Sequence, residues 1–390
     1  MAYSVHYIIN HLGEENKGDY FRAVAPPIIQ TSNFAFSTVQ QLRESFENEY
    51  STWLYSRGLN PTVEILRKKL AALDEAEDCL VVNSGAAAIY MSILSQVKQG
   101  DHVIAVHGVY SWAHQIITQI LPQLGITHTF VDGRSVQNFM AAVRPNTTVV
   151  YLESPTSWLY HTQPLAAIAA WAKQHQIITI CDNSFCTPLG QKPIALGIDI
   201  AIQSATKFIS GHSDVVAGVI SSSKAIIEKM FHQQYMSIGS GIQPFNAWLL
   251  LRGLRTMPLR WQQVHQTAKV VSEYVAKHPM VRQLWCVWQT PFDAENGVEV
   301  STASCGGLLT FSLQVSNAQQ VEDFCNALQH IQMAVSWGGY ESLLIPKCAT
   351  MPLHMVDVHN PEHTSCRLYV GLETAEFIIA DLEQAFQKIR

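Results

Sequence analysis

Short apolar runs alternate with segments of helical period through the middle of the chain. Runs rich in β-branched residues, such as residues 101–108 and 147–155, are followed by segments in which apolar residues recur every three or four positions, such as residues 112–121 and 165–176. Runs of this kind are typical of strands buried on both faces of a parallel sheet. The predicted strands cover residues 77–85, 101–108, 126–133, 147–155, 177–185, 198–207 and 215–223. The pattern predicts an α/β fold with a mostly parallel sheet, whose strands point their carboxyl ends at a ligand crevice.

Two regions outside this alternation have a different pattern. Residues 1–55 contain Pro, Asn and aromatic residues with little helical period, which predicts an extended N-terminal arm that reaches onto another surface. Residues 244–278 form one long helical segment, and fewer strands follow it. We therefore predict three parts: an arm at 1–55, a large domain at 56–250, and a smaller α+β domain at 251–390 that includes the bridging helix.

Composition narrows the classes of function. Of the 390 residues, 48% are hydrophobic and 14% are charged, and this charged share is below the roughly 25% of average soluble domains. The net charge is −6 without a long run of like charge, so the partner is expected to be a small molecule and not a nucleic acid. No run of 18 apolar residues occurs, which predicts a cytoplasmic protein without a membrane segment.

Cysteine and histidine spacing predicts no metal site. The eight cysteines form no CxxC pair, so we expect most of them to be reduced core residues. His107 and His114 could share a helix face, but the sequence offers no third ligand near them.

A single lysine ends one of the predicted strands. In residues 200–212, IAIQSATKFISGH, an apolar run is followed by small hydroxylated residues and Lys207. Burial lowers the pKa of a lysine, and its neutral amine can form a Schiff base with a carbonyl substrate or with pyridoxal phosphate (PLP). The alternative is that Lys207 simply extends into solvent at the end of the strand. If Lys207 is considered without its neighbours, this alternative is favoured. Ser204 and Thr206 could contact a phosphate or bond locally within a turn.

Two other strand ends supply partners for such a lysine. Asp182 follows an apolar run 25 residues before Lys207, and a carboxylate there is either a solvated strand terminus or the counter-charge of a pyridinium nitrogen. Ser84 and Gly85 form a turn before a helix that opens at Ala86. Backbone N–H groups at that helix start could bind a phosphate, although an ordinary strand–helix corner has the same pattern.

Four motifs together resemble the Cys/Met-metabolism family of PLP enzymes, which has the aspartate-aminotransferase fold, fold type I. The sequence SATKFISGHSD resembles the family's lysine motif, AVAPPIIQTSNFAF its N-terminal segment, YSRGLNPT its arm motif, and PFNAWLLLRGLRT its bridging helix. The resemblance covers nearly the whole chain. Within the family, SWGGYESL and ESPTS are most similar to the corresponding segments of bacterial cystathionine β-lyases.

The resemblance implies a role for each candidate residue. Lys207 would be the Schiff-base lysine and proton shuttle, and Asp182 would face the pyridine nitrogen. Tyr110 would stack on the cofactor ring and assist proton transfer. The other implied contacts are Gly85, Ala86, Ser204 and Thr206 to the phosphate, Tyr55 and Arg57 to the phosphate of a neighbouring subunit, and Ser157, Ser336, Trp337 and Arg367 to the substrate. The implied assembly is a homo-oligomer, a dimer of dimers, with active sites shared between chains.

Each of these residues also has an ordinary structural explanation. Tyr110 could be a half-buried loop aromatic, Trp337 a core residue and Arg367 a surface ion pair at a strand start. Arg57 could anchor the arm to its own chain. The joint occurrence of these residues in family order favours the functional interpretation.

Three residues depart from the common family pattern. Ala86 stands where Met is common, and Ser184 stands where Thr is frequent. Ser157 replaces the Asn of an ESPxNP string, which removes an amide that could bond the cofactor hydroxyl or the substrate carboxylate.

The activity implied by the resemblance is that of a PLP-dependent carbon–sulfur lyase. The substrate would be a small sulfur amino acid, and cystathionine β-lyase is the predicted activity, within transsulfuration and methionine biosynthesis. The alternatives within the family are methionine γ-lyase, cystathionine γ-lyase and cystathionine γ-synthase. A remote alternative is a non-catalytic member that serves as a binding subunit.

Overall fold

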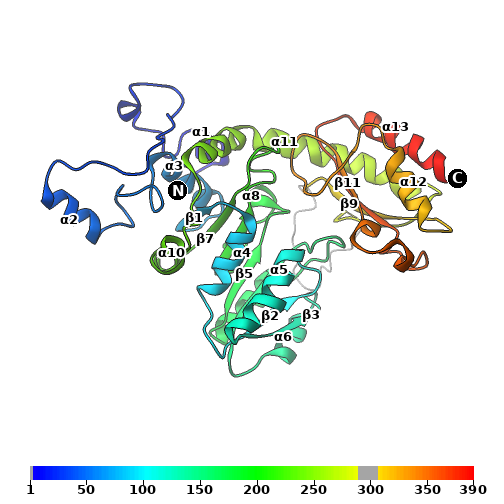
Figure 1. Cartoon of the computed structure of the whole chain (residues 1–390), viewed down its shortest axis with the longest axis horizontal. Helices are drawn as coiled ribbons and strands as arrows, with labels where there is room; N and C mark the ends of the chain where they lie inside the picture. The colour runs from blue at the N-terminus through cyan, green and yellow to red at the C-terminus, as the bar shows by residue number, and fades with distance from the viewer. Residues whose placement is uncertain (1–2, 289–305) are drawn as a thin grey trace.

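A computed structural model describes residues 3–288 and 306–390 of the chain (Figure 1). Its centre is a seven-stranded sheet with the order β1-β7-β6-β5-β4-β2-β3. β7 runs antiparallel to both of its neighbours, and the other strands run parallel to one another. The strands are β1 Asp78–Val82, β2 His102–Val106, β3 Thr127–Val131, β4 Thr147–Glu153, β5 Ile178–Asp182, β6 Ile200–Ser204 and β7 Gly218–Ser222. Each lies within a predicted run, so the predicted mostly parallel α/β sheet is confirmed.

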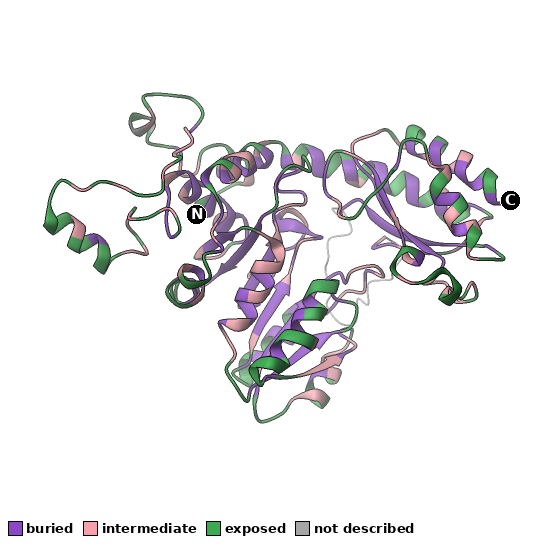
Figure 2. Cartoon of the chain, in the orientation of Figure 1, coloured by how far each residue is buried: buried purple, intermediate pink, exposed green. Residues whose placement is uncertain are grey.

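Helices cover both faces of this sheet, as the apolar runs require. In β1, Leu80 and Val82 belong to one buried cluster while Cys79 and Val81 belong to another, so alternate side chains enter different cores. Figure 2 shows most of these strands buried, while the edge strand β3 is partly exposed. The helices of this region are α3 Pro61–Leu73, α4 Gly85–Leu94, α5 Ser111–Gln115, α6 Val136–Ala142, α7 Leu165–Gln174, α8 Thr187–Gly190, α9 Lys224–Met230 and α10 Met236–Ile238.

Local sequence explains where the helices next to the site begin. Asn60 caps α3 by accepting a hydrogen bond from the Thr62 backbone N–H at 3.0 Å, and Pro61 occupies the first helical position, where its missing N–H costs nothing. Ser84 caps α4 in the same way through the Ala87 N–H at 3.1 Å. The chain therefore leaves β1 and enters α4 in a fixed direction.

One long helix, α11 Pro244–Lys277, runs from the large sheet to the C-terminal part of the chain (Figure 1). The predicted domain boundary at residue 250 falls inside this helix. Beyond it lies a five-stranded sheet with the order β10-β11-β12-β9-β8. Its elements are β8 Val281–Trp285, β9 Leu308–Leu313, α12 Gln319–Ala327, β10 Gln332–Met333, β11 Leu343–Pro346, β12 Ser365–Tyr369 and α13 Ala375–Phe386. A smaller second unit of α+β type is thus present, as predicted.

The N-terminal arm extends away from the rest of the chain (Figure 1), and most of it is exposed (Figure 2). It contains two helices that the sequence pattern did not predict, α1 Val5–Asn10 and α2 Val39–Glu47. Thr38 caps α2 by accepting from the Gln41 N–H at 3.1 Å, and the helix is rich in Gln, Glu and Leu, which are good helix formers. Its apolar residues Val39, Leu42 and Phe46 recur at helical spacing, but they belong to none of the buried clusters of the described residues.

Two expectations from composition can be compared with the described part of the chain. Seven cysteines are described, and all seven are buried and free of disulfide bonds. Cys305 lies outside the described residues. No helix in the ranges 3–288 and 306–390 is both long and apolar enough to span a bilayer, and no group of three His, Cys, Asp or Glu in those ranges could hold a metal ion.

Candidate active site

Lys207 lies in a turn directly after β6 has ended at Ser204. The Lys207 N–H donates to the Ser204 carbonyl at 3.2 Å, and the Lys207 carbonyl accepts from the Gly211 N–H at 2.8 Å. The Lys207 amine donates to the Ser336 hydroxyl and lies 5.3 Å from the centre of the Trp337 ring. Gly338 packs so tightly on the Lys207 backbone that an added Cβ would lie 2.8 Å from Lys207 Cα. The SWGGYESL segment therefore holds this lysine from the C-terminal domain.

The Lys207 amine is set up to lose its proton more easily than an ordinary lysine. Burial lowers the pKa of Lys207 to about 8, the Arg367 guanidinium acts in the same direction, and the Asp182 carboxylate opposes them. The neutral, nucleophilic amine is therefore accessible close to neutral pH.

Asp182 ends β5, and Ser184 holds its carboxylate. The Ser184 N–H and hydroxyl both donate to Asp182 Oδ1, at 2.9 and 2.6 Å, and the Ser184 hydroxyl accepts from the Ser204 N–H at 2.7 Å. Burial raises the pKa of Asp182, while the Ser184 hydrogen bonds and the Lys207 charge oppose the rise. Ser184 thus makes through its hydroxyl a contact that the commoner Thr could also make.

A second buried carboxylate, Glu153, lies beside Asp182. The two residues are register partners at the ends of β4 and β5. Burial and the neighbouring Asp182 charge raise the pKa of Glu153 well above its ordinary value. Two adjacent carboxyl groups do not both ionise readily, and the hydrogen bonds from Ser184 and the charge of Lys207 favour ionisation of Asp182. We assign the negative charge to Asp182 and the retained proton to Glu153 at neutral pH.

Glu153 organises the two loops that frame this edge of the sheet. Its Oε2 accepts from the Tyr110 N–H at 2.7 Å, and its Oε1 accepts from the Ser157 N–H at 2.7 Å and the Ser157 hydroxyl at 2.6 Å. Sequence reasoning did not single out Glu153 as a site residue. The available signal was its place at the end of a predicted strand, as for Asp182.

Tyr110 and Ser157 differ in how much of each side chain remains available. The Tyr110 side chain is 42% exposed, and its pKa is raised by burial and by the Asp182 and Glu153 carboxylates. The Ser157 hydroxyl is engaged by Glu153, so its substrate contact, predicted from the resemblance, stays a prediction.

The candidate phosphate contacts lie together at the start of α4. An added Cβ on Gly85 would lie 3.0 Å from Ser204 Cβ and 3.1 Å from Ser204 Oγ, so the Ser204 hydroxyl sits against the first turn of the helix that also contains Ala86. Glycine allows this close approach. Thr206 is engaged differently, because its hydroxyl donates to the Ala217 carbonyl at 3.2 Å and accepts from the Ala217 N–H at 3.0 Å.

Arg367, in β12, is partly buried and has no carboxylate or hydrogen-bond partner among the residues that the structure describes. Its Cζ atom lies 5.6 Å from the centre of the Trp158 ring. Burial lowers the pKa of Arg367, and the nearby Tyr160, Tyr110 and Glu153 oppose that shift. An unpaired guanidinium in such a place favours an incoming anion, and a carboxylate matches its planar donors.

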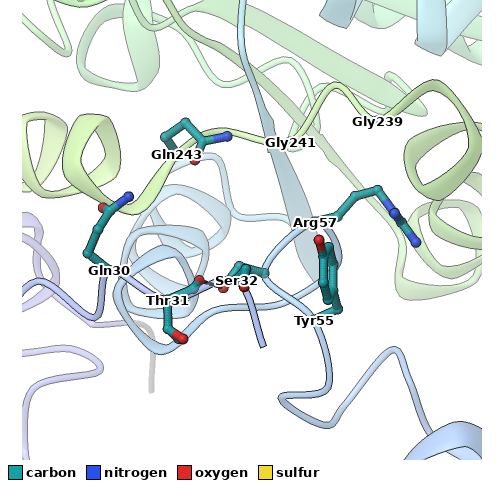
Figure 3. Close-up of a pocket in the computed structure, with 9 residues that line it drawn as sticks. Gln30, Thr31, Ser32, Tyr55, Arg57, Gly239, Gly241 and Gln243 are labelled. Carbon is teal, nitrogen blue, oxygen red and sulfur yellow. Dashed lines mark hydrogen bonds between the residues drawn. The ribbon is translucent and has the colours of Figure 1, made fainter. Parts of the chain in front are cut away.

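Tyr55 and Arg57 lie apart from these groups in the single chain. They line a pocket of about 390 Å³ together with Gln30, Thr31, Ser32, Ser56, Gly239, Gly241 and Gln243. Figure 3 shows Tyr55 and Arg57 on one side of this pocket and Gln30 and Gln243 on the other. The Arg57 guanidinium lies 5.2 Å from the centre of the Tyr55 ring.

The described groups fit PLP chemically. The start of α4 and the Ser204 hydroxyl suit its phosphate, the ionised Asp182 suits its pyridinium nitrogen, and Lys207 offers an amine to its aldehyde. The packing of Gly85 on Ser204 leaves no room for a side chain at the phosphate end. The groups named here therefore suit the negative phosphate and the positive pyridinium nitrogen of the cofactor.

Comparison with known proteins gives a consistent result. A family model described as Cys/Met metabolism PLP-dependent enzyme matches residues 8–387. An L-methionine gamma-lyase of Treponema denticola is 33% identical over 95% of this chain and 94% of its own. A cystathionine beta-lyase of Bacillus subtilis is 33% identical over 94% of this chain and 92% of its own.

The solved structures agree with this match. The structure of a cystathionine gamma-lyase from Lactobacillus plantarum, complexed with L-serine, superposes with a TM-score of 0.88 at 31% identity and covers 99% of each chain. A structure from Corynebacterium glutamicum titled metB superposes with a TM-score of 0.88 at 27% identity, over 100% of this chain and 99% of its own.

Proposed function

Because the chain belongs to the Cys/Met metabolism family of PLP-dependent enzymes, we propose that it is a carbon–sulfur lyase that cleaves L-cystathionine by β-elimination. With one water consumed, the products are homocysteine, pyruvate and ammonia. The relatives include both β- and γ-lyases at 33% identity, so identity alone does not choose between these reactions.

The observation that carries the proposal is the fixed position of the Lys207 amine between Ser336 and Trp337. A β-elimination needs one base to take the proton from the substrate Cα, whereas γ-chemistry needs a further proton shift at Cβ. A lysine amine that is held by both Ser336 and Trp337 suits a mechanism with a single proton transfer from Cα. The engagement of Ser157 by Glu153 supports the same choice, because it takes up a hydroxyl where many relatives have an amide.

Each group has a defined task in this proposal. Arg367 binds the substrate carboxylate through its planar fork and so fixes the orientation of Cα. Lys207 would remove the Cα proton as its neutral amine, and Asp182, held by Ser184, would supply a negative charge for the pyridine nitrogen of the bound cofactor. Tyr110 lies within electrostatic reach of Asp182 and would stack on the ring of the bound cofactor. The bound cofactor supplies an electron sink for the pair left at Cα.

Product analysis tests the reaction directly. Purified, cofactor-loaded protein given L-cystathionine should release pyruvate and homocysteine in equal amounts, with the keto acid identified by mass spectrometry. Predominant 2-oxobutyrate with cysteine would replace the β-lyase proposal with a γ-lyase. Homocysteine release would be consistent with a role in methionine biosynthesis.

The proposed functional unit contains at least two chains, and a dimer of dimers is the assembly that we propose. The support is that Tyr55 and Arg57 line a pocket that none of the Lys207, Asp182 and Arg367 group shares within one chain. An arginine that follows the N-terminal arm and lines a pocket apart from the Lys207 group suits the phosphate of a neighbouring chain.

A further inference from the structure

The Arg367 guanidinium rests on an aromatic ring from a distant part of the chain. Trp158, in the loop after β4, lies under it with 5.6 Å between Arg367 Cζ and the ring centre. A cation over the face of a tryptophan is stabilised by the ring quadrupole, more strongly when both are removed from water. Arg367 makes no ion pair or hydrogen bond with the described residues, so this ring stabilises it alongside the electrostatic influence of Tyr160, Tyr110 and Glu153.

The orientation of that ring is fixed by the strand that carries the arginine. The Trp158 indole N–H donates to Ser365 Oγ at 2.8 Å, and the Ser365 hydroxyl donates to the Glu362 carbonyl at 2.6 Å. Ser365 and Arg367 are two residues apart in β12, so their side chains lie on the same face of the sheet. Trp158 therefore spans this face: its indole N–H bonds to Ser365, and its ring lies under Arg367.

A second cation contacts the same ring. Lys347 Nζ lies 5.0 Å from the centre of the Trp158 ring. Lys347 follows β11, whose Ile345 is the register partner of Arg367. Two positive charges on one ring, with no ion pair to Arg367 among the described residues, make this place favourable for an anion.

The backbone of Trp158 is held in an unusual conformation for this contact. Its φ angle is 73°, in the left-handed region that bulky residues rarely occupy. Such a conformation costs about 1–3 kcal/mol and persists only where the surroundings enforce it. Here the residues on either side of Trp158 enforce this conformation. Ser157, before it, is bound to Glu153, and the hydroxyl of Tyr160, after it, lies 3.1 Å from Thr310 Oγ1 in β9.

From these contacts we infer that Trp158 is a positioning residue for substrate recognition, which holds the Arg367 guanidinium in plane for the substrate carboxylate. Stacking uses the face of the guanidinium and leaves its edge donors free for a bidentate carboxylate. The inference rests on the proposed role of Arg367 as the carboxylate-binding residue. It does not depend on which carbon–sulfur bond is cleaved.

The test uses the cofactor-loaded enzyme and L-alanine, which carries the amine and the carboxylate but no leaving group. The dissociation constant is read from the change in cofactor absorbance at equilibrium. Trp158→Leu removes the ring and should weaken L-alanine binding about tenfold. Trp158→Phe keeps a ring face without the indole N–H and should stay within about threefold of the natural protein. Ethylamine, which is L-alanine without its carboxylate, should bind equally to all three proteins.

A double variant separates positioning from a general structural effect. In an Arg367→Leu background, Trp158→Leu should cause no further loss of L-alanine affinity, because residues that act through one another are not additive. The melting temperature of each apoprotein reports whether the variants fold. Additive losses, equal losses for Trp158→Phe and Trp158→Leu, or an equal loss for ethylamine would each overturn the inference. Normal L-alanine binding by Arg367→Leu would overturn the carboxylate role of Arg367 itself, and the positioning role with it.

Discussion

Ser184 controls the charge of Asp182 through two hydrogen bonds to one carboxylate oxygen. Ser184→Ala removes the hydroxyl donor, so the pKa of Asp182 should rise further above its ordinary value. Because the ionised carboxylate is the useful form, activity should fall about tenfold at pH 7, and the acid limb of the pH–rate profile should move to higher pH. The measurement is kcat/KM against pH.

Ser184→Thr is the matched control, because it keeps the hydroxyl and adds one methyl group. Its acid limb should coincide with that of the natural protein. An unchanged limb in Ser184→Ala would mean that the backbone N–H of residue 184 suffices to keep Asp182 ionised.

The pKa of Lys207, lowered to about 8 by burial and by Arg367, predicts how the apoprotein takes up cofactor. Only the neutral amine reacts, so the rate of PLP capture at Lys207 should rise with pH and level off above about pH 8. Arg367→Leu removes a positive neighbour, which raises the pKa of Lys207 and should move this midpoint to higher pH. Borohydride trapping and peptide mapping measure the capture and should place the label on Lys207. A midpoint unaffected by Arg367→Leu would contradict the electrostatic link.

At the scale of elements, α11 packs through a glycine on the turn that carries Lys207. An added Cβ on Gly253 would lie 2.3 Å from the Ile209 carbonyl oxygen and 2.4 Å from that of Ser210. Gly253→Ala should therefore displace the turn that carries Lys207, with a loss of about 1–3 kcal/mol in the free energy of unfolding and weaker cofactor retention. Denaturant unfolding and cofactor absorbance measure the two effects. Leu259→Ala, at a 70% exposed position of the same helix, should change either property little.

The elements that sequence predicts well are those whose local pattern agrees with their burial. The strands of the large sheet are apolar because both faces are covered, so the runs around β4 and β5 identify them directly. The helix α2 was missed although its apolar residues Val39, Leu42 and Phe46 recur at helical spacing. Val39 and Phe46 are exposed, so the spacing there does not mark a face buried in its own chain. Directly after α5, the chain continues as a π-helical turn over Ile116–Ile120, which a 3.6-residue period does not distinguish from an α-helix.

The candidate site could be predicted where an ionisable side chain directly follows an apolar strand, as at Lys207 and Asp182. Glu153 occupies the same kind of position but was not separated from the surrounding ESPTS motif. Trp158 could not be predicted, because its contact with Ser365 joins residues 207 positions apart. Such pairs are set by how the two sheets meet, and one sequence without an alignment carries no local signal for them.

At the scale of the whole molecule, the arm presents apolar side chains to solvent. Phe21 is 97% exposed and Val24 is 88% exposed, which suits burial against another chain. If Arg57 acts in a neighbour's site, Arg57→Ala and Lys207→Ala should each reduce activity at least a hundredfold. Mixed under conditions of subunit exchange, the two variants should regain about a quarter of the natural activity, because half of the chains are in hybrids and each hybrid dimer has one intact site.

The activity of the mixed variants is compared with the activity of each variant assayed separately. Native mass spectrometry measures how much hybrid has formed. Absence of recovery in proven hybrids would place Arg57 in the site of its own chain. The control is a mixture of the Lys207→Ala and Lys207→Arg variants, prepared in the same way. No hybrid of these two variants contains an intact Lys207.

The strand order of the large sheet also has a consequence for how the protein is made. Among the strands that the structure describes, β1 is an edge strand paired in the sheet with β7 alone. This apolar segment therefore emerges early from the ribosome and has no strand of the sheet to pair with until residue 222 has followed it. About 140 residues of synthesis separate the two strands, roughly 7 to 28 s at ~5–20 residues per second. During that interval the nascent chain displays an unpaired apolar strand, which is the kind of segment that associates with other chains. Ribosome-associated chaperones should therefore bind nascent chains stalled at residue 200 more strongly than chains stalled beyond residue 260, once β7 has left the exit tunnel.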